Sequence, residues 1–120
     1  MAGLTAVDAS VLIAFLDGSD AHHQAAVDAL IAIEQFTVDP ITLAEVLVHP
    51  VRIGQEHDVL ARLQAIGMQI SQTPQNAVAL ARIRAETGLK MPDCIVVALG
   101  RRQAGEVLSF DRRVRAASER

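Results

Sequence analysis

Four acidic residues, here called the acidic quartet, occupy positions where folding alone explains a carboxylate poorly. Asp8 and Asp111 each close an apolar run, Glu45 interrupts one, and Asp93 leads into one. A carboxylate inside or at the lip of an apolar element costs several kcal/mol unless a cation or hydrogen-bond donors compensate it. Four such acids in one short chain predict convergence on a shared divalent cation. Carboxylates are hard oxygen ligands, which suit Mg²⁺ or Mn²⁺ and water-activating chemistry at a phosphate.

Each acid also has a structural explanation when it is considered alone. Asp93 would lie in the first turn of a helix, where a carboxylate interacts favourably with the helix dipole. Glu45 follows Thr42 by three residues, the spacing of a capping box. Asp8 fits an ordinary strand-to-helix turn, and Asp111 fits a cap of the terminal helix. The metal-site prediction therefore rests on the four acids together.

The elements that must position the quartet alternate between strand and helix. Short apolar strands are expected at residues 4–8, 36–38, 68–70 and 106–110. Helices are expected at residues 11–16 with Ser10 as cap, 22–34, 40–50, 55–66, 74–88 with Thr73-Pro74 as start signal, 92–104 and 112–118. This alternation predicts an α/β fold in which helices sandwich a parallel sheet through right-handed crossovers. No repeat or linker interrupts it, so residues 1–120 are expected to form a single domain.

Parallel topology predicts where the quartet should meet. In open parallel sheets, ligands bind beyond the carboxyl ends of the strands, near a topological switch point. Asp8 and Asp111 lie at the carboxyl ends of predicted strands, and Glu45 and Asp93 lie in the first turns of helices on that edge. The four acids should therefore share one edge of the sheet.

Composition favours a compact protein of the cytoplasm. The chain is 51% hydrophobic, yet it lacks the roughly 18 consecutive apolar residues of a membrane span. No signal peptide opens it, and Cys94 stands alone, which excludes a disulfide framework. The apolar excess points to buried strands, covered helices or a subunit interface.

Charge is distributed unevenly along the chain. Residues 1–50 contain seven acids and no Lys or Arg, whereas residues 51–120 contain all eleven basic residues. A phosphate-bearing partner could use the arginine-rich end, and Arg112 and Arg113 beside Asp111 are candidates for contacts to an RNA backbone. The histidines lack zinc-like spacing, and no glycine-rich phosphate loop or Gly-x-Ser-x-Gly elbow is present.

Four segments of the sequence resemble the PIN-domain nucleases, specifically the short VapC-type toxins of bacterial toxin–antitoxin pairs. They follow one another in the family's order and cover nearly the whole chain: residues 7–13, 42–46, 91–96 and 107–111. The His22-His23 pair that opens the second helix is also similar to that family. Arg113 differs, because many members have Asn or Asp at this position.

The resemblance implies a PIN-like three-layer α/β/α sandwich with a central parallel sheet of four to five short strands. It implies a Mg²⁺- or Mn²⁺-dependent endoribonuclease that acts as the toxin of a type II toxin–antitoxin system. The quartet would supply its catalytic acids and metal ligands, and Ser10 and Ser109 would form hydrogen bonds within the pocket. The implied partners are an RNA substrate, a cognate VapB-like antitoxin and a second copy of the chain, without a membrane.

Two other functions compete with this one. A receiver-like phospho-acceptor domain needs an adjacent acidic pair on the first strand and a lysine after the last one. The single lysine, Lys90, instead precedes Asp93. A non-catalytic PIN-like interaction module is the second alternative, and four intact acids count against it. The RNA that is cleaved, the number of metal ions and the identity of the antitoxin stay open.

Overall fold

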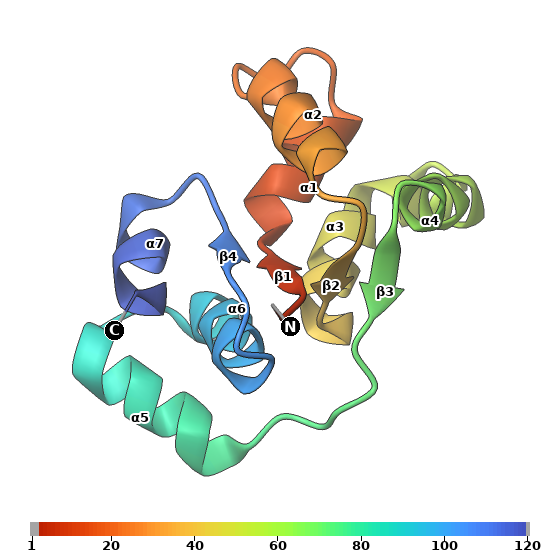
Figure 1. The fold of residues 1–120 in the computed structure, drawn as a ribbon. Coiled ribbons are helices and arrows are strands. Elements are labelled where there is room, and N and C mark those ends of the chain that lie inside the picture. Colours follow the sequence, from red (N-terminus) through yellow and green to blue (C-terminus); the bar gives the residue numbers. More distant parts are fainter. Residues whose placement is uncertain (1–2, 120) are drawn as a thin grey trace.

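The computed structural model describes residues 3–119, which are built around a four-stranded parallel sheet (Figure 1). Its strands are β1 (Thr5–Val7), β2 (Phe36–Val38), β3 (Met68–Ile70) and β4 (Val107–Leu108), in the order β3-β2-β1-β4. The chain builds outward from β1 to β3 and then returns to the free side of β1. The boundary between β1 and β4 is therefore the topological switch point of the sheet.

Seven helices within the described residues connect or follow these strands. They are α1 (Ala9–Leu16), α2 (His23–Ala32), α3 (Pro40–Arg52), α4 (Glu56–Ala65), α5 (Ala77–Thr87), α6 (Met91–Arg102) and α7 (Arg112–Ser118). The predicted alternation of strands and helices is confirmed, and so is the α/β class. Among residues 3–119, no helix has the length and apolar character needed to cross a membrane.

Alternation of side chains along the strands produces the predicted three layers. Val7, Phe36 and Met68 are buried in one cluster with residues of α1, α2, α3 and α4. Ala6 faces the other way and packs with Val96 of α6. Because successive side chains of a strand point to opposite faces, α1–α4 cover one face of the sheet and α6 covers the other.

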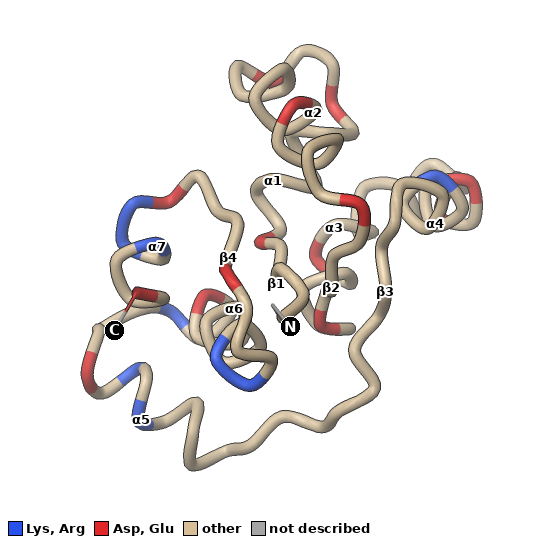
Figure 2. The backbone as a smooth tube through the Cα atoms, in the orientation of Figure 1, with Lys and Arg blue, Asp and Glu red and all other residues tan. Residues whose placement is uncertain are grey.

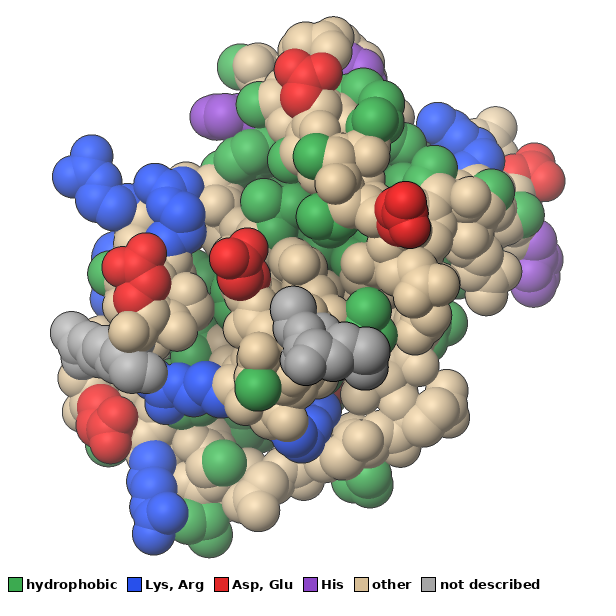
Figure 3. Space-filling view, in the orientation of Figure 1, with side chains coloured by type: hydrophobic (Ala, Val, Ile, Leu, Met, Phe, Trp, Pro, Cys, Tyr) green, Lys and Arg blue, Asp and Glu red, His purple; other side chains and the backbone are tan. Residues whose placement is uncertain are grey.

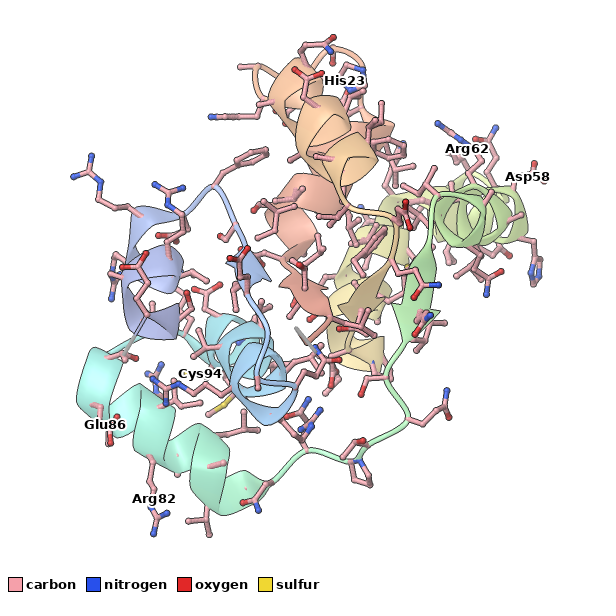
Figure 4. The ribbon with its side chains drawn as sticks, viewed as in Figure 1. His23, Asp58, Arg62, Arg82, Glu86 and Cys94 are labelled. Atoms are coloured by element: carbon pink, nitrogen blue, oxygen red, sulfur yellow. The ribbon has the colours of Figure 1, made fainter. Side chains whose placement is uncertain are left out.

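The layer on the α6 side depends on small residues. Gly100 allows α6 to lie against β4, since a Cβ at this position would be 2.5 Å from a methyl carbon of Val107. Cys94 is fully buried in one cluster with Ile83 of α5. Its side chain points toward α5 in Figure 4. A free cysteine in such a cluster serves as a small apolar residue of the core.

The start of α5 differs from the prediction. Thr73-Pro74 resembles a helix start, but the helix begins at Ala77, where the Asn76 side chain accepts a hydrogen bond of 3.0 Å from the backbone N–H of Ala79. Gln75 donates a hydrogen bond to the buried Asp39, which follows β2. This long-range contact holds the preceding residues outside the helix, and local spacing carries no sign of it.

Two caps beside the quartet also differ from expectation, although α3 begins at Pro40 as predicted. Asp8, not Ser10, occupies the N-cap of α1, and its side chain makes no capping hydrogen bond. Asp39 caps α3 by accepting a hydrogen bond of 2.8 Å from the N–H of Ile41. Thr42 therefore lies inside α3, and the capping-box explanation for Glu45 is wrong.

Candidate acidic site

An open pocket of about 510 Å³ at the carboxyl edge of the sheet is lined by all four members of the acidic quartet. Asp8 follows β1 directly, and Asp111 precedes α7, three residues beyond the end of β4. Glu45 comes from the second turn of α3, and Asp93 comes from the first turn of α6. Four acids that are distant in sequence thus meet at one edge of the sheet, beside the switch point. Their catalytic roles remain a prediction.

Asp8 is the buried and rigidly held member of the quartet. Only 7% of its surface is exposed, and its Oδ2 atom accepts a hydrogen bond of 2.7 Å from the Ser109 hydroxyl and one of 3.3 Å from the Ser10 hydroxyl. Its backbone N–H donates to the carbonyl of Leu108. Hydroxyl donors and the sheet ladder therefore fix this carboxylate, and both predicted serines contact it.

Ser109 connects Asp8 to Asp111. Its hydroxyl donates to Asp8 and accepts a hydrogen bond of 3.0 Å from the backbone N–H of Asp111. One oxygen of Asp111 accepts a hydrogen bond of 2.8 Å from the N–H of Arg113, so this residue caps α7 as its structural explanation predicted. Capping uses Oδ1, and Asp111 still lines the pocket.

The other two carboxyls resist ionisation. Burial raises the pKa of Glu45 above its ordinary value, and the negative charges of Asp8 and Asp93 raise it further. Burial likewise raises the pKa of Asp93, as do the charges of Asp8 and Asp111, while Lys90 and Arg113 act in the opposite direction. A like charge nearby disfavours the ionised form of a carboxyl. The pocket therefore has an excess of negative charge that a bound cation would relieve.

The donor set fits a hard divalent cation. The pocket lining contains four carboxylates of the quartet and no Lys, Arg or Cys. Within residues 3–119, no three potential ligands lie close enough together to hold an ion directly as they stand. Mg²⁺ commonly keeps several waters and uses only one or two protein carboxylates. The arrangement therefore suits an ion that is bound partly through water.

A second group of side chains, which the sequence analysis did not assign to the site, forms part of the same pocket. Asp20, His22 and Phe110 line it together with the quartet. The rings of His22 and Phe110 are stacked, with centroids 4.9 Å apart and planes inclined by 25°. His23 has a different role, because its Nδ1 lies 2.8 Å from the carbonyl oxygen of Ala14 and attaches α2 to α1. Two signals in the sequence could have drawn attention to the stack: the His22-His23 pair and the position of Phe110 next to Asp111.

Basic residues lie outside the pocket and mainly in the second half of the fold. Figure 2 shows Lys and Arg segments on α5, α6 and α7, whereas the stretch of chain from β1 to the end of α2 carries acids and no Lys or Arg. Arg112 and Arg113 are exposed at the start of α7. Because Arg113 acts on the pKa of Asp93, its charge reaches the pocket.

Two apolar depressions lie elsewhere on the surface. A groove of about 610 Å³ between α1, α3 and α4 shares Ile13 and Glu45 with the acidic pocket. Val48 and Ile53 line this groove and are about half exposed, at 48% and 52%. Apolar side chains also gather beneath α2 in Figure 3, where a depression of about 420 Å³ includes Ile31.

Comparisons with known proteins agree with this geometry. The family model of the PIN domain matches residues 5–119, a range that contains the whole quartet. A chain of a toxin–antitoxin complex from Klebsiella pneumoniae has a similar structure, with a TM-score of 0.76 and 26% identity. The similarity covers 90% of this chain and 86% of that chain. No curated protein matches the sequence.

Proposed function

The chain belongs to the PIN domain family, and from this premise we propose that it is a Mg²⁺- or Mn²⁺-dependent endoribonuclease. The quartet would hydrolyse RNA phosphodiester bonds. One observation carries the proposal: four carboxylates from separate elements line one pocket, where burial and neighbouring negative charges raise the pKa of two of them. Nuclease activity is general among PIN domains, which gives independent support.

The residues of the pocket would have different roles in binding the metal ion and in hydrolysis. Asp8, Glu45, Asp93 and Asp111 would hold the ion, and Ser10 and Ser109 would orient Asp8. When bound, the ion would neutralise charge on the scissile phosphate and make a coordinated water more acidic. Glu45 and Asp93, whose pKa values are raised, are suited to position a water or to accept a proton from it.

Arg112 and Arg113 would contact the RNA backbone. Both side chains are exposed at the start of α7, next to a pocket that has no cation of its own in its lining. Neutralising phosphates with arginine releases counterions and contributes binding that does not depend on sequence. The guanidinium groups would thus hold the strand while the acids act on one phosphate.

We further propose that the protein is the toxin of a type II toxin–antitoxin pair and binds a VapB-like antitoxin. The similar chain from Klebsiella pneumoniae comes from a toxin–antitoxin complex, which supports this assignment. The antitoxin would place an Arg or Lys side chain in the acidic pocket, since a guanidinium can pair with carboxylates in a bidentate manner. A structure of the complex that leaves the quartet open to solvent would refute this mode of inhibition.

Three broader expectations belong to the same proposal. A homodimer would cover part of the exposed apolar surface, which includes Ile41 at 51% and Val51 at 57% exposure. Light scattering that detects only monomers at micromolar concentration would contradict it. Residues 1–120 would form one nuclease domain, as the family match over residues 5–119 suggests. A cytoplasmic location fits the free, buried Cys94.

Cleavage of structured RNA by the purified protein tests the proposed activity. Cleavage should require Mg²⁺ or Mn²⁺, and a chelator should abolish it. Restoring the metal in excess of the chelator should restore cleavage, which excludes irreversible damage as the cause of the loss. Unchanged cleavage in EDTA would refute the proposed dependence of cleavage on a metal ion.

A further inference from the structure

The stacked rings of His22 and Phe110 occupy the rim of the acidic pocket, although the protein is poor in aromatic residues. The chain has three phenylalanines and no Trp or Tyr. Phe36 is fully buried, and Phe15 packs against the same core as Phe36. Phe110 also packs partly against this core, but it differs from the other two because it lines the pocket that contains the quartet.

Both rings are held in place by their surroundings. Phe110 lies between Ser109 and Asp111, and the Ser109 hydroxyl fixes that segment through its hydrogen bonds to Asp8 and to the backbone of Asp111. On the other side, Asp20 accepts a hydrogen bond of 2.7 Å from the backbone N–H of His22. The Asp20 carboxylate also lies 3.7 Å from the Nδ1 atom of His22. The stack is therefore organised before any ligand binds.

The stack still presents an open aromatic surface. The His22 side chain is 64% exposed although it packs against Phe110. Since Phe110 covers one face of the imidazole, the exposed area includes its edges and its opposite face. An aromatic face of this kind can stack with any nucleobase and contributes sequence-tolerant affinity.

The charges around the stack select a base over a phosphate. The pocket lining contains Asp20 and the quartet but no Lys or Arg, so this rim repels an uncompensated phosphate. Two exposed arginines, Arg112 and Arg113, lie outside the pocket at the start of α7. A nucleotide could thus direct its backbone toward α7 and its base toward the aromatic rings.

We propose that the His22–Phe110 stack is a platform for the base of a nucleotide that flanks the scissile phosphate. This inference rests on the proposed nuclease function and adds two positioning residues to it. Phe110 supports the imidazole from behind, and His22 contacts the base. Loss of the platform should weaken RNA binding and change which positions are cut, while the quartet itself stays intact.

Binding can be measured without cleavage, in EDTA. The probes are short single-stranded oligoribonucleotides with 2-aminopurine at successive positions, whose fluorescence falls when the base stacks. The parent should quench the probe at one preferred position. Phe110→Leu, which keeps an apolar side chain, and His22→Ala, which leaves the backbone contact to Asp20, should each abolish the quenching and weaken binding about tenfold. His57→Ala on the exposed face of α4 should behave like the parent.

The possible outcomes separate this proposal from the proposed nuclease function. Position-specific quenching that both variants lose, at unchanged melting temperature, supports the platform even if the parent cleaves no RNA in Mg²⁺ or Mn²⁺. Quenching that both variants retain overturns the platform. Loss of quenching in Phe110→Leu alone, together with a lower melting temperature, assigns the ring to structure and also overturns it. Cleavage by a parent that never quenches a probe would leave the nuclease standing without the platform.

Discussion

The two halves of the acidic pocket are constructed differently. At the switch point of the sheet, Asp8 is buried and accepts hydrogen bonds from the hydroxyls of Ser109 and Ser10. On the helical side, burial and neighbouring charges raise the pKa of Glu45 and Asp93. Lys90 and Arg113 lower the pKa of Asp93 only in part. One half is electrostatically satisfied by the protein, and the other is not.

This contrast indicates how a folded protein can tolerate four close acids. Hydroxyl donors make the Asp8 charge part of the fold, so removing them should cost stability. The charges of Glu45 and Asp93 instead oppose each other across the pocket, so removing one should cost function but not stability. Asp8, on the strand side, would thus be a carboxylate held in a fixed position. Glu45 and Asp93, on the helical side, would carry the negative charge that a cation compensates.

The largest expected effect is on catalysis, through Asp93. Asp93→Asn keeps the shape of the side chain and removes one charge, so cleavage should fall by at least about a hundredfold. The metal-free variant should be as stable as the parent or more so, because one repulsive charge is gone. Rates of RNA cleavage and thermal melts in EDTA measure the two effects.

Asp58→Asn on α4 is the matched control, because Asp58 projects from α4 away from the strands and is exposed (Figure 4). It should leave both quantities unchanged. A marked drop in the melting temperature of metal-free Asp93→Asn would identify Asp93 as a structural residue of α6 and remove it from the site.

The next effect is on stability, through Ser109. Ser109→Ala removes the 2.7 Å hydrogen bond to Asp8 and leaves a buried carboxylate oxygen with a weaker set of donors. The free energy of unfolding should fall by about 1–3 kcal/mol. Ser10→Ala removes the longer, 3.3 Å contact at an exposed position and should cost less than about 1 kcal/mol. Urea unfolding of both variants provides the comparison, and equal losses would contradict the assigned difference.

A smaller effect concerns the pH dependence of stability, to which Glu45 contributes. Its pKa and that of Asp93 are raised in the folded protein, so the folded state holds protons that the unfolded chain has already released. The stability that these protons contribute is complete below the ordinary values of 4.5 for Glu45 and 3.8 for Asp93. It is lost as the pH rises through the raised values. Glu45→Gln should therefore gain stability relative to the parent across this window.

Unfolding measured in EDTA at a series of pH values tests this sign. The difference between Glu45→Gln and the parent should be smallest at the acid end and increase with pH. Saturating Mg²⁺ should raise the melting temperature of the parent, because a ligand of the folded state stabilises it by mass action. The same Mg²⁺ should do less for the variant. A difference that shrinks as the pH rises would show that Glu45 is not repelled in the folded state.

The smallest expected effect concerns Arg112 and Arg113 at the start of α7. Replacing either with Ala should weaken binding of single-stranded RNA and reduce the dependence of log K on log salt by about 0.7 per lost phosphate contact. The cap of α7 should survive in Arg113→Ala, because Asp111 accepts from the backbone N–H of that residue. Arg82→Ala on α5, far from the start of α7 in Figure 4, is the matched control. An unchanged salt dependence in both variants would move the RNA path away from α7.

Local chemistry made much of the fold predictable. The helix expected from residue 40 begins at Pro40, because the Asp39 side chain caps it and a proline in the first turn favours it, and both act within a few residues. Gly88 ended α5 as predicted, since its φ of 71° is the left-handed conformation that glycine adopts without strain. Thr73-Pro74 gave a wrong helix start because Gln75 donates a hydrogen bond to Asp39. Gln75 lies between β3 and α5, whereas Asp39 lies between β2 and α3. Such a contact has no local signature.

The sequence by itself determined which residue types were available, the α/β alternation and the four acids that could converge. Only the tertiary structure decided which of those acids the protein satisfies. Asp8 and Ser109 meet because β1 and β4 are neighbours in the sheet, although they are distant in the chain. His22 and Phe110 stack for a similar reason, since the start of α2 and the end of the β4 segment meet at one pocket. Hydrogen bonds, pKa shifts and stacking depend on distances of a few ångströms. Those distances arise only when the strands assemble in the order β3-β2-β1-β4.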